Sequence, residues 1–231
     1  LPDEIDELCL CLARNPRLKV VSVFSHLSGS DNNRFDDFTK MQVTIYEKMY
    51  ARIIVTLGYR PLRHILNSGG ISRHPNLHFD MVRIGIGMYG IENSSSTSRL
   101  LEKTHILKTR ITQIKKVTSI DRISYNNSGS LSGDGIIAVL SIGYADGLPR
   151  VAGILGYKIF VNGIACPLVG AVCMDMCMVD ITGAGSVKEG DEVEIFGRNR
   201  PIEELAQITG RIPYEIICGI SGRVKRIYTE E

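Results

Sequence analysis

Polar side chains that could do chemistry cluster around three short apolar runs in the first part of the sequence. They are His26, His64, Asn67, Ser68 and Arg83. Ligand sites of α/β proteins lie at the carboxyl ends of parallel strands, just after such runs. If the runs are neighbouring strands, these side chains therefore converge on one site.

Arg83 is unusual because it lies inside an apolar run, between Val82 and Ile84. A buried guanidinium is costly unless it has partners. The sequence leaves two interpretations open. Arg83 is a structural residue that pairs with Asp80 or reaches solvent at a strand edge, or it serves a ligand.

The glycines that follow Arg83 match a dinucleotide-binding pattern, since residues 85–90 read GIGMYG. That pattern requires a strand-to-helix turn. Here a Ser-rich stretch follows instead of a helix, so we reject a Rossmann site. The glycines still allow a phosphate to approach backbone N–H groups.

Tyr144 lies in the segment GYADG at 143–147, where an apolar run ends and a turn begins. It is either a structural tyrosine that caps a hairpin or an acid–base group. Acid–base work requires that its pKa of roughly 10 be lowered by nearby positive charge. Arg83 and His26 could supply that charge if the fold brings them close.

Asp175 lies between two methionines in the run CMDMCMVD at 173–180. Alternation along a strand predicts that Cys173, Asp175 and Cys177 share one face. The methionines on the other face are typical of core packing. An aspartate in such surroundings needs a partner, and the sequence does not identify it.

The composition indicates a globular protein. Of 231 residues, 44% are hydrophobic and 23% charged, with a net charge of +2. The charges are mixed along the chain, so a nucleic-acid partner is not favoured. No apolar run approaches the roughly 20 residues that cross a bilayer.

Without a secretory signal, the six cysteines are expected to be reduced thiols in a cytoplasmic protein rather than disulfides or metal ligands.

The elements that must position these side chains form two regions of different texture. In the first, short apolar runs alternate with helical spacing, which predicts a parallel α/β unit. The run at 18–24 is expected to be a strand buried on both faces. The predicted elements are helices at 3–15 and 35–53 and strands at 18–24, 62–68 and 80–89.

A Ser-rich run at 92–98 reads as a linker, and the sequence beyond it is mostly β. One short helix is expected at 201–209. The predicted strands lie near 106–114 and at 136–144, 157–162, 168–181, 192–196 and 224–228. A small β-barrel or sandwich follows from this pattern.

Seven segments in order and spacing resemble the alanine racemase family. They are SHLSGSD (25–31), HILNSGG (64–70), DMVRIGIGMYG (80–90), ISYNNSG (123–129), LSIGYADGLPR (140–150), GAVCMDMCMVD (170–180) and ISGRV (220–224). The resemblance covers nearly the whole chain. It implies an α/β plus all-β fold: residues 1–98 are the C-terminal part of a TIM (β/α)8 barrel, and residues 99–231 are a small β-barrel-like domain.

By this resemblance, the cofactor is pyridoxal 5'-phosphate (PLP) and the reaction is racemisation of alanine for cell-wall peptidoglycan precursors. Tyr144 looks like the catalytic tyrosine that exchanges the Cα proton on one face of the substrate. Arg83 looks like the arginine that contacts the pyridine nitrogen. His26 looks like the histidine that links this arginine to the tyrosine and lowers its pKa.

The resemblance also implies contacts with the rest of the cofactor and with the substrate. Ser68 looks like a phosphate ligand through its hydroxyl, and Gly85 and Ile86 through backbone N–H groups. Met174 looks like the residue whose N–H binds the substrate carboxylate, with Asp175 supporting it. In this family the tyrosine and the Met–Asp pair reach into the partner's barrel, which implies a head-to-tail homodimer.

The chain departs from the family in two respects. The chain lacks the early barrel strands and an arginine that the family uses to hold the substrate carboxylate. It also lacks the family's lysine, which holds PLP and exchanges the Cα proton on the other face of the substrate. This chain alone is therefore expected to be inactive. The tail ISGRVKRIYTEE is reminiscent of racemases fused behind a cell-wall peptide ligase, and such a fusion would explain a chain that begins within a longer protein. Gly222 replaces a tyrosine at the substrate entrance, which weakens the preference for alanine over serine.

Two alternatives therefore stay open beside alanine racemisation. One is a serine or broad-specificity racemase on the same scaffold. The other is a non-catalytic PLP-binding or dimerisation module, for which the missing lysine is the main support. Retention of Tyr144, His26 and Arg83 together argues against the module.

Overall fold

The regularly spaced apolar residues that follow Phe35 form a long helix, α2, from Asp36 to Leu57. The structure is a computed structural model that describes residues 2–91 and 101–229. Two aspartates in the first turn favour the helix start, where the dipole is positive. The helix ends at Gly58, whose φ of 75° lies in the left-handed region that glycine adopts without strain. The helix predicted at 35–53 is confirmed and extends one turn further.

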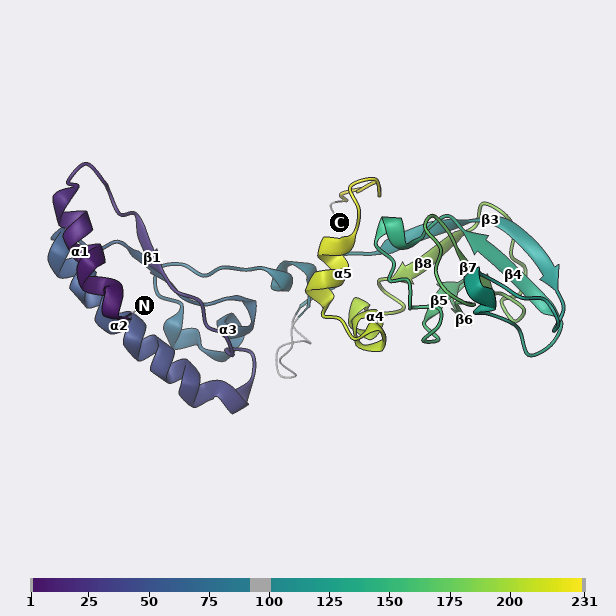
Figure 1. Cartoon of the computed structure of the whole chain (residues 1–231), viewed down its shortest axis with the longest axis horizontal. Helices are drawn as coiled ribbons and strands as arrows, with labels where there is room; N and C mark the ends of the chain where they lie inside the picture. Colours follow the sequence, from purple (N-terminus) through teal and green to yellow (C-terminus); the bar gives the residue numbers. More distant parts are fainter. Residues whose placement is uncertain (1, 92–100, 230–231) are drawn as a thin grey trace. The chain divides into compact units, whose positions relative to one another are not determined.

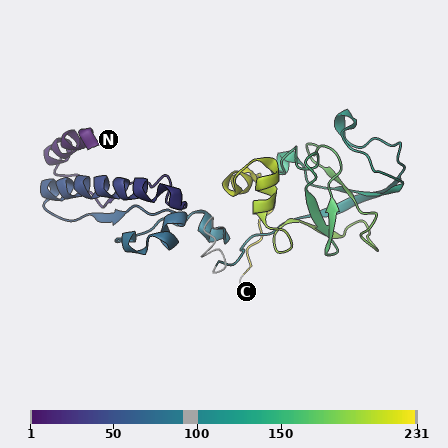
Figure 2. The ribbon, with the colours of Figure 1, turned by 90° about the horizontal axis from the view of Figure 1, so that it is seen from below.

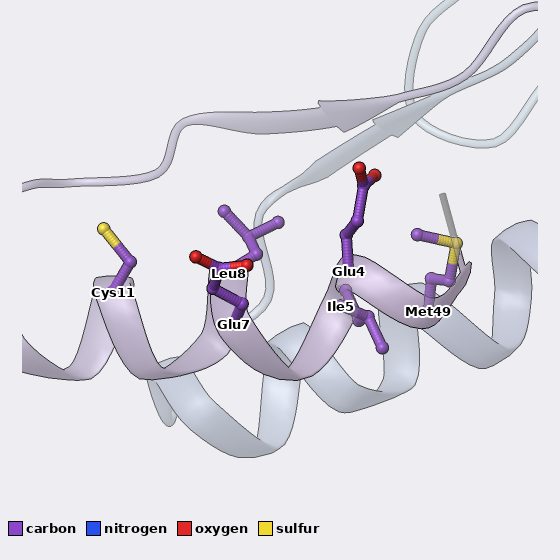
Figure 3. A pocket seen from close by; sticks show the side chains of 6 residues that line it. All are labelled: Glu4, Ile5, Glu7, Leu8, Cys11 and Met49. Atoms are coloured by element: carbon purple, nitrogen blue, oxygen red, sulfur yellow. The ribbon is translucent and has the colours of Figure 1, made fainter.

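The predicted N-terminal helix is also confirmed, as a 3-10 turn at Pro2–Glu4 followed by α1 at Ile5–Arg14. This helix lies along α2 (Figures 1 and 2), with Ile5 and Cys9 packed against Ile53. Asp6 of α1 and Arg52 of α2 form an ion pair at the surface of the two helices. A hollow of about 370 Å³ runs over α1 beside Met49 (Figure 3), and its lining includes none of the candidate site residues.

Two short parallel strands, β1 (Ser22–Phe24) and β2 (Leu62–His64), lie beside α2. The prediction of a strand at 18–24 buried on both faces is wrong. The strand is three residues long, and Phe24 is 65% exposed. Among the described residues β1 pairs with β2 alone, so no second neighbour covers its other edge.

The buried side chains come immediately after these strands, at the positions where the chain turns toward the candidate site. Leu27, Ile65 and Leu66 are almost fully buried and pack with Tyr46 of α2. Their burial fixes the backbone just after His26 and just before Ser68. This small core is therefore what positions the polar loops.

The third predicted strand, at 80–89, does not form. The chain there is extended and bonds to the β2 segment at two separated points, Asp80 N–H to Arg63 O and Arg83 N–H to Leu66 O. Two isolated bonds do not make a ladder, and the glycines then turn the chain into a 3-10 helix at Ile86–Tyr89. The preceding segment holds α3 (Ser68–Arg73) and a 3-10 turn at Pro75–Leu77.

The Ser-rich linker predicted at 92–98 lies outside the described residues. The chain divides into two units, Leu1–Thr104 and His105–Glu231. This division falls a few residues after the boundary expected at 98/99.

The second unit is a six-stranded antiparallel sheet in the order β6-β5-β8-β3-β4-β7. An isolated bridge between Leu168 and Val179 links the end of β6 to β7, so the sheet nearly closes on itself (Figure 1). The predicted β-barrel-like domain is confirmed. The strands are β3 (Leu107–Val117), β4 (Gly135–Leu140), β5 (Lys158–Val161), β6 (Ile164–Pro167), β7 (Cys177–Asp180) and β8 (Glu192–Phe196).

Helix α4 (Ile202–Thr209) was expected, and α5 (Pro213–Gly219) was not. The strand predicted at 224–228 is wrong. The guanidinium of Arg226 donates to the carbonyls of Ile220, Ser221 and Val224, so the tail curls around its own arginine instead of joining the sheet. Across residues 2–91 and 101–229, no helix combines the length and apolar composition that crossing a bilayer requires.

Candidate active site

Arg83 is held by carbonyl groups and rings rather than by a carboxylate. Its guanidinium donates to Ser25 O at 2.8 Å and to His64 Nδ1 at 2.8 Å, and it lies 5.3 Å from the centre of the Phe24 ring. Asp80, the structural partner that the sequence suggested, pairs instead with Arg63 at 3.7 Å. Arg83 therefore keeps a full positive charge for a ligand, because no anion of the first unit neutralises it among the described residues.

His64, a candidate that the sequence named without giving it a role, is also a member of this site. It is buried, it stacks on Phe24, and burial together with the adjacent Arg83 charge lowers its pKa. A neutral imidazole accepts at one nitrogen and donates at the other. Because Nδ1 accepts from Arg83, Nε2 carries the proton and donates to Ser22 Oγ at 3.3 Å. The sequence signal that could have given it a role is its position at the end of strand β2.

His26 lies on the other side of the guanidinium. Its Nδ1 is 3.4 Å from Arg83 Nη2, and its Nε2 is 3.4 Å from Asn67 Nδ2. In a neutral ring only one of these two contacts can be a hydrogen bond, since both neighbours are donors. The structure thus brings His26 and Arg83 together as expected. Tyr144 lies in the other unit, so the expected link from His26 to Tyr144 stays a prediction.

Ser68 forms the second part of the site, at the start of α3. Its Oγ accepts two backbone N–H groups, from Gly85 at 2.8 Å and from Gly87 at 3.2 Å. With both lone pairs engaged, the hydroxyl proton points elsewhere and can donate to an anion. Gly85 and Ser68 are therefore together as expected, although the Gly85 N–H is directed at the serine. The neighbouring Ile86 is buried at the start of its 3-10 helix.

Asn67 secures this loop through every polar atom of its amide. Its Oδ1 accepts from Ser30 Oγ at 2.8 Å and from Gly70 N–H at 3.1 Å, and its Nδ2 donates to Leu27 O. The amide caps α3 and ties the loop after β1 to the loop after β2. The Ser68 end and the Arg83 end of the site are thus built from adjacent loops.

These residues fit a cofactor that has a phosphate at one end and an aromatic nitrogen at the other. Ser68 offers an anion a hydroxyl proton, and Gly85 and Gly87 let it approach backbone that carries no Cβ atom at these two positions. Arg83 offers a charged group that does not give up its proton. A TIM barrel places phosphate sites at its late βα loops, which agrees.

In the second unit, Tyr144 begins a 3-10 turn, Tyr144–Asp146, which residues 141–143 separate from the end of β4. Its side chain is 42% exposed, and its N–H donates to Cys173 O at 2.9 Å. Gly143 allows this contact, because a Cβ at that position would lie 2.2 Å from Met174 O. The turn that carries the tyrosine is therefore pressed against the Met174 backbone.

The expected alternation of Cys173, Asp175 and Cys177 on one strand face is wrong. Cys173 N–H donates to Met176 O, so residues 173–176 form a tight turn and β7 begins only at Cys177. Met174 and Asp175 occupy the tip of the turn, where Met174 is 54% exposed. The Met174 N–H has no partner among the described residues, and Asp175 pairs with Arg223.

The fold of the chain is similar to that of solved alanine racemases. The chain matches the structure of alanine racemase from Bartonella henselae with covalently bound pyridoxal phosphate at a TM-score of 0.82 and 28% identity, covering 96% of this chain and 62% of that one. It matches an alanine racemase of Clostridium difficile at a TM-score of 0.90 and 32% identity, covering 99% of this chain and 60% of that one.

The chain belongs to the alanine racemase family. Residues 1–93 match the N-terminal domain model of alanine racemase and residues 105–228 match the C-terminal domain model. The alanine racemase of Treponema denticola is 35% identical over 242 residues, which cover all of this chain and 63% of that protein. The chain thus spans somewhat less than two thirds of the length of this relative.

Proposed function

We propose that the protein to which this chain belongs interconverts L- and D-alanine with PLP, and so supplies D-alanine for peptidoglycan precursors. The observation that carries the proposal is the setting of Arg83. The guanidinium lies between two histidines, has no carboxylate partner among the described residues of its unit, and adjoins the Ser68 loop. A guanidinium beside two histidines and without a carboxylate is suited to an acceptor atom of a ligand.

PLP, when bound, withdraws electrons from the Cα of an attached amino acid and so makes its proton removable. In our proposal Ser68 would donate its hydroxyl to the phosphate and Ile86 its backbone N–H. The Gly85 N–H, which donates to Ser68 Oγ in this structure, would contribute by turning from that oxygen to the phosphate. Arg83 faces the pyridine nitrogen. A guanidinium donates hydrogen bonds and has no acceptor atom, so the nitrogen would accept a hydrogen bond from Arg83 without becoming protonated.

Tyr144 is proposed as the base on one face of the substrate, holding or releasing the Cα proton at its phenolic oxygen. A lysine outside this chain would serve the other face. The N–H of Met174, which has no partner in the part of the chain that the structure describes, is suited to the substrate carboxylate, and its place at the tip of a turn makes it accessible. Asp175 would help to fix that turn.

We further propose a cytoplasmic homodimer in which each active site uses both chains. The first unit carries the cofactor residues and the second carries Tyr144 and Met174. Six free cysteines, among them the exposed Cys11 and Cys218, suit a reducing compartment. A head-to-tail arrangement would bring the second unit of one subunit to the first unit of its partner.

The test is an alanine racemisation assay with added PLP, on this chain and on the protein extended to its native start. We expect activity in the extended protein and none in this chain. PLP binding without racemisation of any amino acid would instead indicate a non-catalytic module. Activity in this chain alone would show that the second base lies within it.

Gly222 supports a second candidate, a serine or broad-specificity racemase. A Cβ built at this position meets nothing within 4 Å, so the space is open in this unit and a larger side chain could be accommodated. Substitution Gly222→Tyr is expected to raise the ratio of kcat/KM for alanine over serine by about 10-fold. An unchanged ratio would show that Gly222 does not set the substrate preference.

A further inference from the structure

Arg223 joins the two loops of the second unit that carry candidate site residues. Its Nε donates to Asp146 Oδ1 at 2.7 Å, and its Nη2 donates to Asp175 Oδ1 at 2.5 Å. Asp146 closes the tyrosine turn, and Asp175 follows Met174 in the other turn. One rigid, planar guanidinium therefore spans both turns, and two separate nitrogens make the two contacts.

The Asp146 end of this bridge is tied into the tyrosine turn itself. Its second oxygen, Oδ2, accepts the Gly143 N–H at 2.8 Å, so the carboxylate reaches both the start of the turn and the arginine. The Asp146 carbonyl also accepts the Ser221 N–H at 3.0 Å. Residues 221–223 of the tail therefore bond to both the backbone carbonyl and the carboxylate of Asp146.

The electrostatics of Asp146 agree with this geometry. Burial raises its pKa, but the hydrogen bond from Arg223 and the Gly143 N–H more than offset that effect, and the net pKa is lowered. The side chain is only 13% exposed, in contrast to 55% for Asp175. The inner half of the bridge is therefore the half that fixes the position of the turn.

The two turns also touch through their backbones. Tyr144 N–H donates to Cys173 O and Ala145 N–H donates to Met174 O at 3.0 Å. Arg223 adds a side-chain brace on the same pair of turns. Without its charge, two carboxylates would remain beside the N–H that we assign to the substrate carboxylate, and like charges would oppose binding there.

We infer that Arg223 is a positioning residue, which sets the tyrosine turn against the Met174 turn and screens the substrate carboxylate from Asp146 and Asp175. The inference rests on the proposed function. Arg223 acts through these two aspartates and does not itself touch the reacting atoms. Loss of the bridge should therefore raise KM for the amino acid as well as lower kcat.

The test compares Arg223→Met with Arg226→Met in the extended, PLP-loaded protein. Arg226 lies in the same tail but, within residues 2–91 and 101–229, bonds only to backbone carbonyls, so its variant reports general damage to the tail. We expect kcat/KM for alanine to fall by about 10- to 100-fold with Arg223→Met, with a clear rise in KM, and to change much less with Arg226→Met. Arg223→Lys keeps the charge without the fork and should recover part of the loss.

A second readout does not depend on activity. The carboxyl titration of Asp146, followed by NMR with 13C-labelled aspartate and assigned with Asp146→Asn, should move upward in Arg223→Met and stay in place in Arg226→Met. If the parent protein racemises alanine but the two arginine variants behave alike, the inference is wrong. If the parent racemises nothing, the proposed function fails, and an unmoved Asp146 titration would still overturn the bridge.

Discussion

His64 shows at the scale of one residue how burial and a neighbouring charge select a protonation state. Its ring is buried, and Arg83 occupies Nδ1, so the neutral form is favoured and the pKa is lowered. A histidine with a lowered folded-state pKa contributes stability that is fully present above its unfolded pKa of about 6.5. That contribution is lost as the pH falls from there through the folded-state pKa.

We therefore expect the thermal stability of the first unit to decrease from pH 7.5 to pH 5, and expect His64→Asn to reduce this dependence. His74, whose pKa is lowered by burial and by Arg73, acts in the same direction and accounts for a remainder. The measurement is the unfolding midpoint across this range. His78→Asn is the control, since that ring bonds Ile71 O at the surface. Equal slopes for both variants would contradict the account.

Ser68 provides a second prediction at this scale. Replacing it with alanine removes the acceptor for Gly85 and Gly87 and the proton that we assign to the phosphate. PLP affinity should fall by roughly 10-fold or more, because hydrogen bonds to charged groups contribute about 1.5–3 kcal/mol. This affinity is measured from the change in PLP absorbance when the cofactor is titrated with the protein. Ser72→Ala, in the same helix, should leave the affinity close to that of the parent.

At the scale of elements, the tyrosine turn depends on a glycine that brings two backbones together. Gly143→Ala would place a Cβ 2.2 Å from Met174 O, against backbone that cannot yield easily. We expect a loss of roughly 2 kcal/mol or more in the unfolding free energy of the second unit, together with reduced activity. Denaturant unfolding compares it with Gly183→Ala, where a Cβ meets nothing within 4 Å. A similar small effect for both would show that the turn relaxes.

Elements also show where local pattern was sufficient and where it was not. The helix at α2 followed from periodic apolar residues, because a helix satisfies its own backbone groups. The strand expected at 80–89 failed because a strand needs a partner along its whole length, and only two bonds form there. The strand expected at 224–228 failed for a related reason, since Arg226 bonds back to carbonyls of its own tail, Val224 O among them, and no described strand pairs with this segment.

At the scale of the whole molecule, the candidate residues are divided between two units, which makes sharing between subunits testable. We expect that mixing subunits carrying Tyr144→Phe with subunits carrying Arg83→Glu restores activity. Random pairing gives about half mixed dimers, each with one intact site, so roughly a quarter of the parental activity should return. The assay is alanine racemisation after co-refolding or co-expression. No recovery would place each site within one chain.

The sequence by itself determined the family, the order of the two regions and most of the candidate site, because motif residues and periodicity are local properties of the chain. His26, Ser68, Arg83, Tyr144 and Met174 could all be proposed from such segments. Only the tertiary structure decided which groups stand beside them. The pairing of Arg83 with His64 joins residues 19 apart, and Arg223 meets Asp146 across 77 positions. Contacts at such separations depend on packing of distant segments, and no local pattern encodes them.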